Sequence, residues 1–281
     1  MKVLVTGANG QLGYDVIKRL KEIGDTPIAA SSKEFDITDS QATMDFFAQH
    51  SPEAVIHCAA YTAVDKAEDD KDMCRLVNVE GTKNIANCCN IFDAKLIYIS
   101  SDYVFGGEGE ELLETDDPKN PECVYGQTKL EGEGMAMLCP RCFIVRTSWV
   151  FGINGNNFVK TMLRLSESHD ELKVVDDQIG SPTYTPDLAK LLCEMIHTES
   201  YGVYHASNEG FCSWAKFAKT IMFEADKNTK INPCTSEEYP AKAKRPHNSR
   251  LSKKSLGYAG FDRLPDWHDA LERFLKELAL Q

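Results

Sequence analysis

The sequence predicts an α/β fold: a Rossmann-like, doubly wound parallel sheet with a smaller C-terminal α/β substrate domain. Three observations predict it. Short apolar runs of the kind found in buried strands alternate with helical patterns through the first half of the chain. A glycine-rich turn, TGANGQLG, joins the first strand to the first helix. Beyond Thr147 the regular alternation stops, and shorter strands and irregular loops follow.

The first strand, turn and helix are the most informative part of the N-terminal half. Lys2–Thr6 suits a buried strand, Gly7, Gly10 and Gly13 follow, and a helical pattern then runs to Ile23. Glycines permit a tight turn, let the backbone approach a phosphate and let the helix pack closely on the strand. The spacing G-x-x-G-x-x-G is a shifted relative of the dinucleotide fingerprint G-x-G-x-x-G. We therefore expect a nicotinamide dinucleotide to bind here.

The end of the second strand bears on the choice of cofactor. Thr26–Ser31 is a strand pattern whose end is expected near the adenosine ribose. Sites for NAD tend to place an acidic residue there, whereas a 2′-phosphate requires its absence and favours a cation. The chain offers Ser31, Ser32 and Lys33, which favours NADPH, and leaves NADH open because Glu34 follows closely. A solvated polar turn is the alternative interpretation.

The third strand, Glu53–Cys58, ends in residues suited to the path of a cofactor. Ala59 and Ala60 are small enough to let it cross the strand end, and Thr62 supplies a hydroxyl beside it. His57 lies within the strand, where a histidine is more often a hydrogen-bonded core residue than a base. We assign His57 no catalytic role.

The fourth strand and the helix that follows it carry the groups expected to do chemistry. Ala94–Ile99 is a buried strand pattern that leads into Ser101, and this end of a parallel strand faces the ligand crevice. Val124–Leu138 favours a helix, on which Tyr125 and Lys129, four residues apart, share one face. The sequence thus predicts a hydroxyl and a phenol beside an amine.

These three side chains suit the reduction of a ketone by a nicotinamide. Hydride transfer makes an alkoxide that must receive a proton. Tyr125 can donate it if Lys129 lowers the pKa of the phenol, normally about 10, and the same ammonium can hold the nicotinamide ribose. Ser101 can stabilise the developing charge with a hydrogen bond. The Tyr-x-x-x-Lys pattern also occurs at Tyr14 and Lys18, but that copy lacks a strand-end hydroxyl at a suitable distance upstream.

The second half of the chain is predicted to add a substrate domain. Helical patterns cover residues 158–165, 186–197 and 213–224, and a final helix spans Asp266–Leu280. An apolar stripe on that helix indicates core packing or a dimer face, and consists of Trp267, Leu271, Phe274, Leu275 and Leu278. We expect residues 1–148 plus approximately 185–200 to form an NAD(P)-binding domain, and residues 149–184 and 201–281 to form a substrate-binding domain.

One basic segment stands out because the chain as a whole is acidic. It contains six cations and no acid, namely Lys242, Lys244, Arg245, Arg250, Lys253 and Lys254. Pro246, Asn248 and Ser249 within it are typical of a shaped loop. A charge run usually marks a solvated face. The alternative that we favour here is a loop that meets a substrate bearing a diphosphate.

The composition restricts the partners that we expect. The chain has 281 residues and a formal net charge of −12, and a nucleic-acid-binding surface needs a basic patch, so we expect no nucleic acid. No apolar run approaches membrane-spanning length and the N-terminus enters a strand without a leader, so we expect no membrane and a cytoplasmic location. Ten scattered cysteines include only one C-x-x-C, Cys139 and Cys142, so we expect reduced thiols and no metal site.

Together these residues resemble the extended short-chain dehydrogenase/reductase superfamily and, within it, the dTDP-4-dehydrorhamnose reductase family. The resemblance extends over nearly the whole chain. Its motifs are TGANGQLG at Thr6, AAYTAVDKAE at Ala59, SSDYVF at Ser100, YGQTK at Tyr125, RTSWVFG at Arg146, NNFVKTML at Asn156, DQIGSPTYTPDLA at Asp177 and RPHNSRL at Arg245. The last four lie outside what a generic reductase shares, which makes the resemblance specific.

The resemblance implies reduction of the 4-keto group of dTDP-6-deoxy-L-lyxo-4-hexulose with NADPH or NADH, the step that yields dTDP-L-rhamnose. By motif, it implies a catalytic trio of Ser101, Tyr125 and Lys129. It implies substrate contacts from Asp102, Trp149, Arg245 and Asn248. It implies cofactor contacts from the glycine turn and from residues after the second and third strands, namely Gly7, Gln11, Leu12, Asp36, Ile37, Ala59, Ala60 and Thr62.

The chain departs from the family pattern at three places. Ser101 stands where the family often has Thr, and the hydroxyl remains. Gly106 and Gly107 replace a common Asp-Gly, which predicts a looser loop over the site. Some members dimerise through a metal held by acidic residues; Asp15 matches one such position, but Pro186 stands near another. We expect a monomer or a homodimer.

Two other functions compete with a reductase. A nucleotide-sugar epimerase or dehydratase of the same superfamily keeps its cofactor and returns the hydride, and a dehydratase needs an acid and a base beside the tyrosine, where Asp102 supplies one carboxylate. A non-catalytic NADP-binding regulatory subunit has no need of Tyr125 and Lys129, yet both are present.

Overall fold

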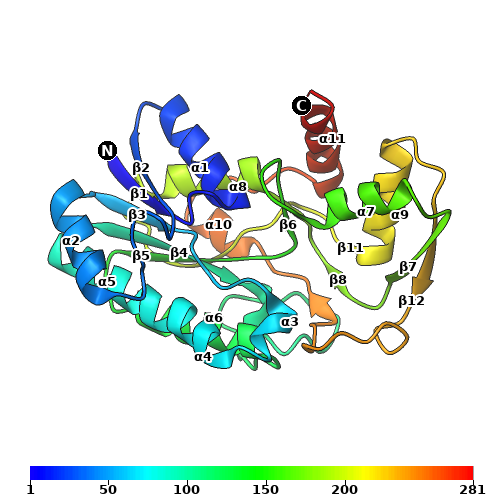
Figure 1. Ribbon diagram of the computed structural model, residues 1–281, viewed down its shortest axis with the longest axis horizontal. Helices are drawn as coiled ribbons and strands as arrows, with labels where there is room; N and C mark the ends of the chain where they lie inside the picture. The colour runs from blue at the N-terminus through cyan, green and yellow to red at the C-terminus, as the bar shows by residue number, and fades with distance from the viewer. Residues whose placement is uncertain (281) are drawn as a thin grey trace.

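The computed structural model describes residues 1–280 and contains the doubly wound sheet that the sequence predicts (Figure 1). All of its strand pairs are parallel, and the strand order is β10-β5-β4-β3-β1-β2. The strands are β1 (Lys2–Thr6), β2 (Thr26–Ala30), β3 (Ala54–His57), β4 (Lys95–Ser101), β5 (Cys142–Thr147) and β10 (Gly202–His205). The order reverses between β1 and β3, which is where ligands bind in such sheets.

Helices cover both faces of this sheet because its strands are apolar on both faces. Val3 and Val5 of β1 pack with α1 (Gln11–Glu22) and α8 (Thr185–Met195) on one face. Leu4 packs on the other face, under the helices α2 (Ser40–His50), α5 (Thr82–Ile91) and α6 (Val124–Ala136). Figure 1 shows the two helical layers on either side of the sheet.

Short elements occupy the edge of the sheet at which its strands end. They are α3 (Val64–Ala67), α4 (Lys71–Arg75), the π-helix η1 (Leu76–Gly81) and the 3₁₀ turn η2 (Asp102–Val104). A π-helical turn within a helical segment often lies at a functional site. Here η1 follows α4 directly and leads into α5.

The remaining elements build a second, smaller core on the right of Figure 1. Its helices are α7 (Phe158–Ser166), α9 (Trp214–Glu224) and α11 (Trp267–Leu278). Its strand pairs are β6 (Val150–Phe151) with β9 (Thr183–Tyr184), and β7 (Glu171–Val175) with β12 (Lys230–Cys234). A third small sheet has the order β11-β8-β13 and consists of β8 (Ile179–Gly180), β11 (Cys212–Ser213) and β13 (Asn248–Ser249).

One part of the predicted division differs from the structure. Residues 202–205, which the sequence analysis placed in the substrate domain, form β10, the edge strand of the large sheet, paired with β5. Leu256 of α10 (Lys254–Tyr258) and Leu264 belong to the core of that sheet as well. The prediction was wrong here because β10 joins the sheet by pairing with β5, some 60 residues earlier, after the intervening chain has built part of the second core.

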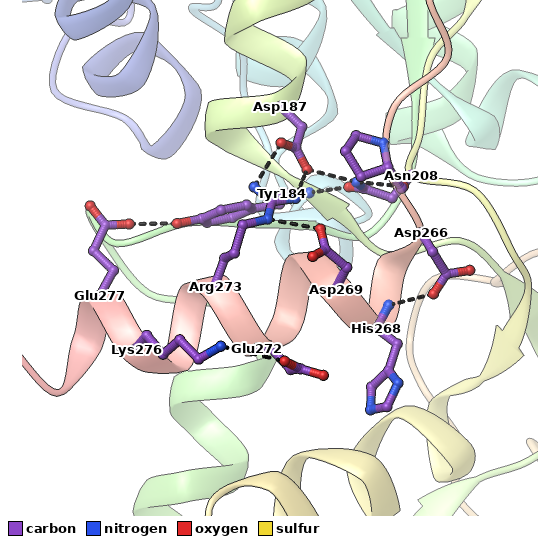
Figure 2. Close-up of polar contacts among 11 residues, drawn as sticks. Tyr184, Asp187, Asn208, Asp266, His268, Asp269, Glu272, Arg273, Lys276 and Glu277 are labelled. Atoms are coloured by element: carbon purple, nitrogen blue, oxygen red, sulfur yellow. Dashed lines mark hydrogen bonds and ion pairs between the residues drawn. The ribbon is translucent and has the colours of Figure 1, made fainter.

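The last helix, α11, is fastened to the rest of the molecule by polar contacts on one side and apolar ones on the other. Arg273 makes two hydrogen bonds to the Asp187 carboxylate, at 2.8 and 2.7 Å, and Tyr184 donates to Glu277 at 2.5 Å (Figure 2). Leu271 and Phe274 are fully buried. Of the two interpretations of the apolar stripe, core packing is the one that the structure confirms.

Among residues 1–280, no helix combines the length and the apolar character needed to cross a membrane.

Candidate active site

A pocket of about 910 Å³ opens at the edge where the strands of the large sheet end. Such volumes are typical of cofactor and substrate sites. It is lined by the glycine turn, by the segments that follow β2, β3 and β4, and by the start of α6. The second core closes it with Trp149, Asn157 and Trp214. The pocket thus lies between the two parts of the molecule.

The glycine turn has the shape that a dinucleotide pyrophosphate requires. Gly7 has a φ of +65°, and a Cβ on it would lie 2.7 Å from the Ala59 nitrogen. A Cβ on Gly13 would lie 2.3 Å from the Gly7 oxygen, so both positions admit only glycine. Gly10 precedes α1, and in the described part of the chain no side chain caps that helix. Its N-terminal amides therefore face the pocket as donors for an anion, and the residues present fit the cofactor.

Every cofactor-binding residue that the sequence predicts lines this pocket. They are Gly7, Gly10, Gln11, Leu12, Gly13, Ser31, Asp36, Ile37, Ala59, Ala60, Thr62, Tyr125 and Lys129. At the end of β2, the Ser31 backbone NH and hydroxyl both donate to the Glu34 carboxylate, at 2.7 and 2.6 Å. Glu34 is held by this turn and is not among the lining residues, whereas Ser31 and Ser32 are.

Ser101 and Asp102, at the end of β4, are joined by hydrogen bonds to each other and to the second core. Ser101 Oγ donates to Asp102 Oδ1 at 2.9 Å, and Ser249 Oγ of β13 donates to Asp102 Oδ2 at 2.5 Å. Both residues line the pocket, as does Trp149. Asp102 therefore ties the edge of the large sheet at which β4 ends to the small sheet that carries β13.

The start of α6 is brought close to the end of β4 by the absence of a side chain. A Cβ on Gly126 would lie 2.2 Å from the Tyr103 oxygen, so any larger residue would push the helix away. Asn78 of η1 fixes the next turn, since its Nδ2 donates to Thr128 Oγ1 at 3.1 Å and its Oδ1 accepts from the Tyr61 NH at 2.8 Å. Together these contacts set the position of Tyr125 beside Ser101.

Burial controls the protonation of the tyrosine and the lysine. Lys129 Nζ donates to the Ile99 oxygen at 2.7 Å and lies 4.1 Å from the Tyr98 ring centre. Burial lowers the pKa of Lys129 to about 7. Burial also raises the pKa of Tyr125, and the Ser101 hydroxyl acts in the opposite direction. The net pKa of Tyr125 is therefore raised and not lowered as the sequence suggested, because desolvation outweighs the influences that act in the opposite direction. The phenol stays protonated at neutral pH, as a proton donor must.

Asp102 gives the first testable prediction, which concerns stability. Burial raises its pKa to about 6, so between about pH 4 and pH 6 the folded chain holds a proton there that the unfolded chain has lost. The free energy of unfolding therefore falls as the pH rises through that window. We expect Asp102→Asn to make this fall shallower in urea denaturation. Burial raises the pKa of Asp15 to about 6 as well, so some slope remains. A slope equal to that of the parent protein would contradict the prediction.

The basic segment does not form a free cationic patch. Acidic residues from other elements pair with four of its cations, as Lys242–Asp69, Lys244–Glu122, Arg245–Asp65 and Lys254–Glu114. Lys253 is buried beside Ser181. Arg245 and Asn248, both predicted to contact substrate, are not among the residues that line the pocket. The sequence suggested a loop of cations available to a diphosphate. It did not reveal that most of these cations are paired, because the partner carboxylates come from distant segments.

The loop that contains Gly106 and Gly107 is held more firmly than expected. The Asn248 NH donates to the Gly107 oxygen at 2.8 Å, and Asn248 Nδ2 donates to the Glu111 oxygen at 2.9 Å. Leu113 and Leu251 form a β-bridge just beyond. The prediction of a looser loop was therefore wrong, because Asn248 supplies the hydrogen bonds that keep it in place.

His57 has the structural role that the sequence suggested. Its two ring nitrogens lie 2.6 Å from Thr6 Oγ1 and 3.2 Å from Thr82 Oγ1. All ten cysteines are free thiols, including Cys139 and Cys142.

Sequence reasoning missed two residues that shape the pocket, Asn157 and Trp214. Asn157 Nδ2 donates to Gln11 Oε1 at 3.1 Å, which joins the second core to the glycine turn. Trp214 lines the pocket next to Trp149. Asn157 belongs to the motif NNFVKTML, which was noted for the family resemblance, but no role was assigned to it. Nothing in the local sequence of Trp214 indicated that it lies at the pocket.

Comparisons with known proteins agree on one family. The family model described as the RmlD substrate binding domain matches residues 1–280. The spore coat polysaccharide biosynthesis protein SpsK of Bacillus subtilis is 43% identical over 277 residues, which cover 98% of this chain and 97% of that protein.

Two solved structures are similar over their full length. A dTDP-4-dehydrorhamnose reductase from Clostridium acetobutylicum superimposes with a TM-score of 0.97 and 44% identity, covering 99% of this chain and 100% of that one. A dTDP-4-dehydrorhamnose reductase from Bacillus anthracis, solved in complex with NADP, gives a TM-score of 0.96 and 42% identity, covering 98% and 99%.

Proposed function

The chain belongs to the RmlD substrate binding domain family, and we propose that it is a dTDP-4-dehydrorhamnose reductase. It takes a dTDP-sugar and reduces the 4-keto group of dTDP-6-deoxy-L-lyxo-4-hexulose to give dTDP-L-rhamnose. NADPH is its preferred reductant, by analogy with the relative bound to NADP. One observation supports this proposal above the others: a single pocket holds a glycine turn shaped for pyrophosphate together with Ser101, Tyr125 and Lys129.

The cofactor, when bound, supplies the hydride, and the residues of the chain handle the oxygen that becomes negative. Tyr125 gives its phenolic proton to that oxygen. The Ser101 hydroxyl, which donates to Asp102 in the structure, turns its one proton to the same oxygen as the charge develops. Lys129, whose pKa burial lowers to about 7, is the adjacent group that stabilises the phenolate left behind. In this proposal Asp102 and Trp149, which line the pocket, contact the sugar, and Arg245 and Asn248 belong to the neighbouring loop.

A substrate assay tests the proposal. We expect the purified protein to oxidise one NADPH per molecule of the 4-keto sugar nucleotide. The loss of NADPH absorbance measures this reaction. An epimerase or dehydratase returns its hydride and consumes no NADPH, and a regulatory subunit binds the cofactor without turnover. Either of these results would overturn the assignment.

The preference between the cofactors is tested at Ser31. We expect Ser31→Asp to raise the KM for NADPH by about tenfold and to leave the KM for NADH little changed, because a carboxylate there repels the 2′-phosphate and accepts hydrogen bonds from a free ribose. The measurement is the ratio of kcat/KM for the two cofactors. Lys33→Met serves as a partner variant, since it removes the nearby cation without adding an acid. An unchanged ratio in Ser31→Asp would mean that the ribose lies elsewhere.

A further inference from the structure

Two tryptophans from distant parts of the chain stack at the wall of the pocket. The ring centres of Trp149 and Trp214 lie 3.7 Å apart, and their planes are inclined by 14°. Both line the pocket. Trp149 lies in the short connection between β5 and β6, whereas Trp214 is the first residue of α9. The stack therefore connects the segment that leaves the large sheet to the second core.

Two contacts hold the Trp149 indole. A Cβ on Gly180 would lie 2.9 Å from Trp149 Cε2, so the indole occupies the space that a side chain there would fill. Trp214 stacks on the indole and itself contacts Phe158, at 4.5 Å between ring centres. Gly180 and Trp214 are brought together by the antiparallel pairing of β8 with β11, which sets Gly180 opposite Cys212.

The backbone of Trp149 needs this support. Its φ is +50°, a left-handed conformation that is rare for a bulky residue and that persists only where the surroundings fix it. The Trp149 carbonyl accepts a hydrogen bond from the Thr183 NH at 3.1 Å, which fixes the main chain but leaves the indole free to turn. The stacking with Trp214 and the close approach to Gly180 are the contacts that restrict the position of the ring.

We propose that Trp214 is a positioning residue, which holds the Trp149 indole against Gly180 and thereby fixes the wall that receives the sugar nucleotide. This inference rests on the proposed function. The reacting oxygen is served by Ser101 and Tyr125, which belong to the large sheet and α6. A loosened Trp149 therefore weakens substrate binding and leaves the chemical step largely intact.

The test is a double-mutant cycle between the two tryptophans. We expect Trp214→Leu to raise the KM for the sugar nucleotide by about fivefold, with kcat and the KM for NADPH changed by less than about twofold. Trp214→Phe keeps an aromatic ring and restores most of the affinity. In a chain that already carries Trp149→Leu, adding Trp214→Leu raises the KM no further, because the two residues act as one unit. Phe223→Ala is the matched control, since Phe223 lies on the same helix and is 81% exposed.

Three results would overturn the inference. An unchanged KM for the sugar nucleotide in Trp214→Leu shows that the stack does not fix the part of the pocket wall that binds the substrate. Additive effects in the double variant show that Trp214 acts independently of Trp149. A parent protein that does not reduce the sugar nucleotide refutes the proposed function itself and this inference with it. An active parent with an additive cycle refutes the inference alone.

Discussion

Tyr125→Phe lowers kcat by about two to four orders of magnitude, because it removes the proton donor and leaves the ring in place. Tyr125 lines the pocket beside Ser101, and its raised pKa keeps the proton available at neutral pH. The fold is expected to be unaffected, since the phenol oxygen is not needed to fill the site. Steady-state kinetics with NADPH and the 4-keto sugar nucleotide measure the effect.

The chain contains its own control for this experiment. Tyr14 begins the second Tyr-x-x-x-Lys pattern, on α1, and is 45% exposed. Tyr14→Phe is expected to leave kcat unchanged. Equal kcat values for the Tyr125→Phe and parent proteins would show that another group donates the proton, and the assignment of Tyr125 would be abandoned. A fall in both variants would point to a change of fold, which thermal unfolding detects.

Glu133→Gln is expected to lower the free energy of unfolding by about 3 to 5 kcal/mol, the largest effect on stability that we predict. Glu133 and Arg146 are almost fully buried and are joined by two hydrogen bonds, at 2.7 and 2.8 Å. Ser100 Oγ donates to the same carboxylate at 2.6 Å. The substitution leaves the Arg146 charge without a counter-ion in the core, and desolvation makes such a charge costly.

A neighbouring ion pair on the same helix provides the comparison. Glu131 pairs with Arg75 at the surface, with both side chains partly exposed. Glu131→Gln is expected to cost less than about 1 kcal/mol, because water screens that pair. Urea denaturation of the two variants measures the difference. Similar decreases in the free energy of unfolding of the two variants would show that burial does not make the loss of Glu133 more costly than the loss of Glu131. Arg146→Gln combined with Glu133→Gln is expected to recover part of the loss, since the charge is then removed.

The features that the sequence alone predicted are those that depend on neighbours along the chain. The glycine turn is one, because Gly7, Gly10 and Gly13 lie within seven consecutive residues, in the β1–α1 connection and the first turn of α1. The spacing of Tyr125 and Lys129 is another, since a helix places residues four apart on one face. The apolar runs predicted the strands of the large sheet for the same reason. Only the four-residue strand β10 was not assigned to this sheet.

The predictions that the structure corrected concern features that depend on residues far away in the sequence. The basic segment looked unpaired because Asp65, Asp69, Glu114 and Glu122 lie more than a hundred residues before it. The pKa of Tyr125 was expected to fall from the proximity of Lys129, but the degree of burial decides it, and burial is a property of the folded molecule. Gly106 and Gly107 suggested a loose loop because nothing nearby revealed the hydrogen bonds from Asn248.

Sequence by itself determined the fold class, the cofactor turn and the three residues proposed for catalysis, since each is encoded in a short stretch with its own periodicity or spacing. Tertiary structure alone decided how these stretches meet: Asp102 bonded to Ser249, Asn157 to Gln11, and Trp149 stacked on Trp214. The physical reason is that a side chain's protonation and orientation are fixed by whatever packs against it. In this chain those neighbours come from segments some 65 to 150 residues away.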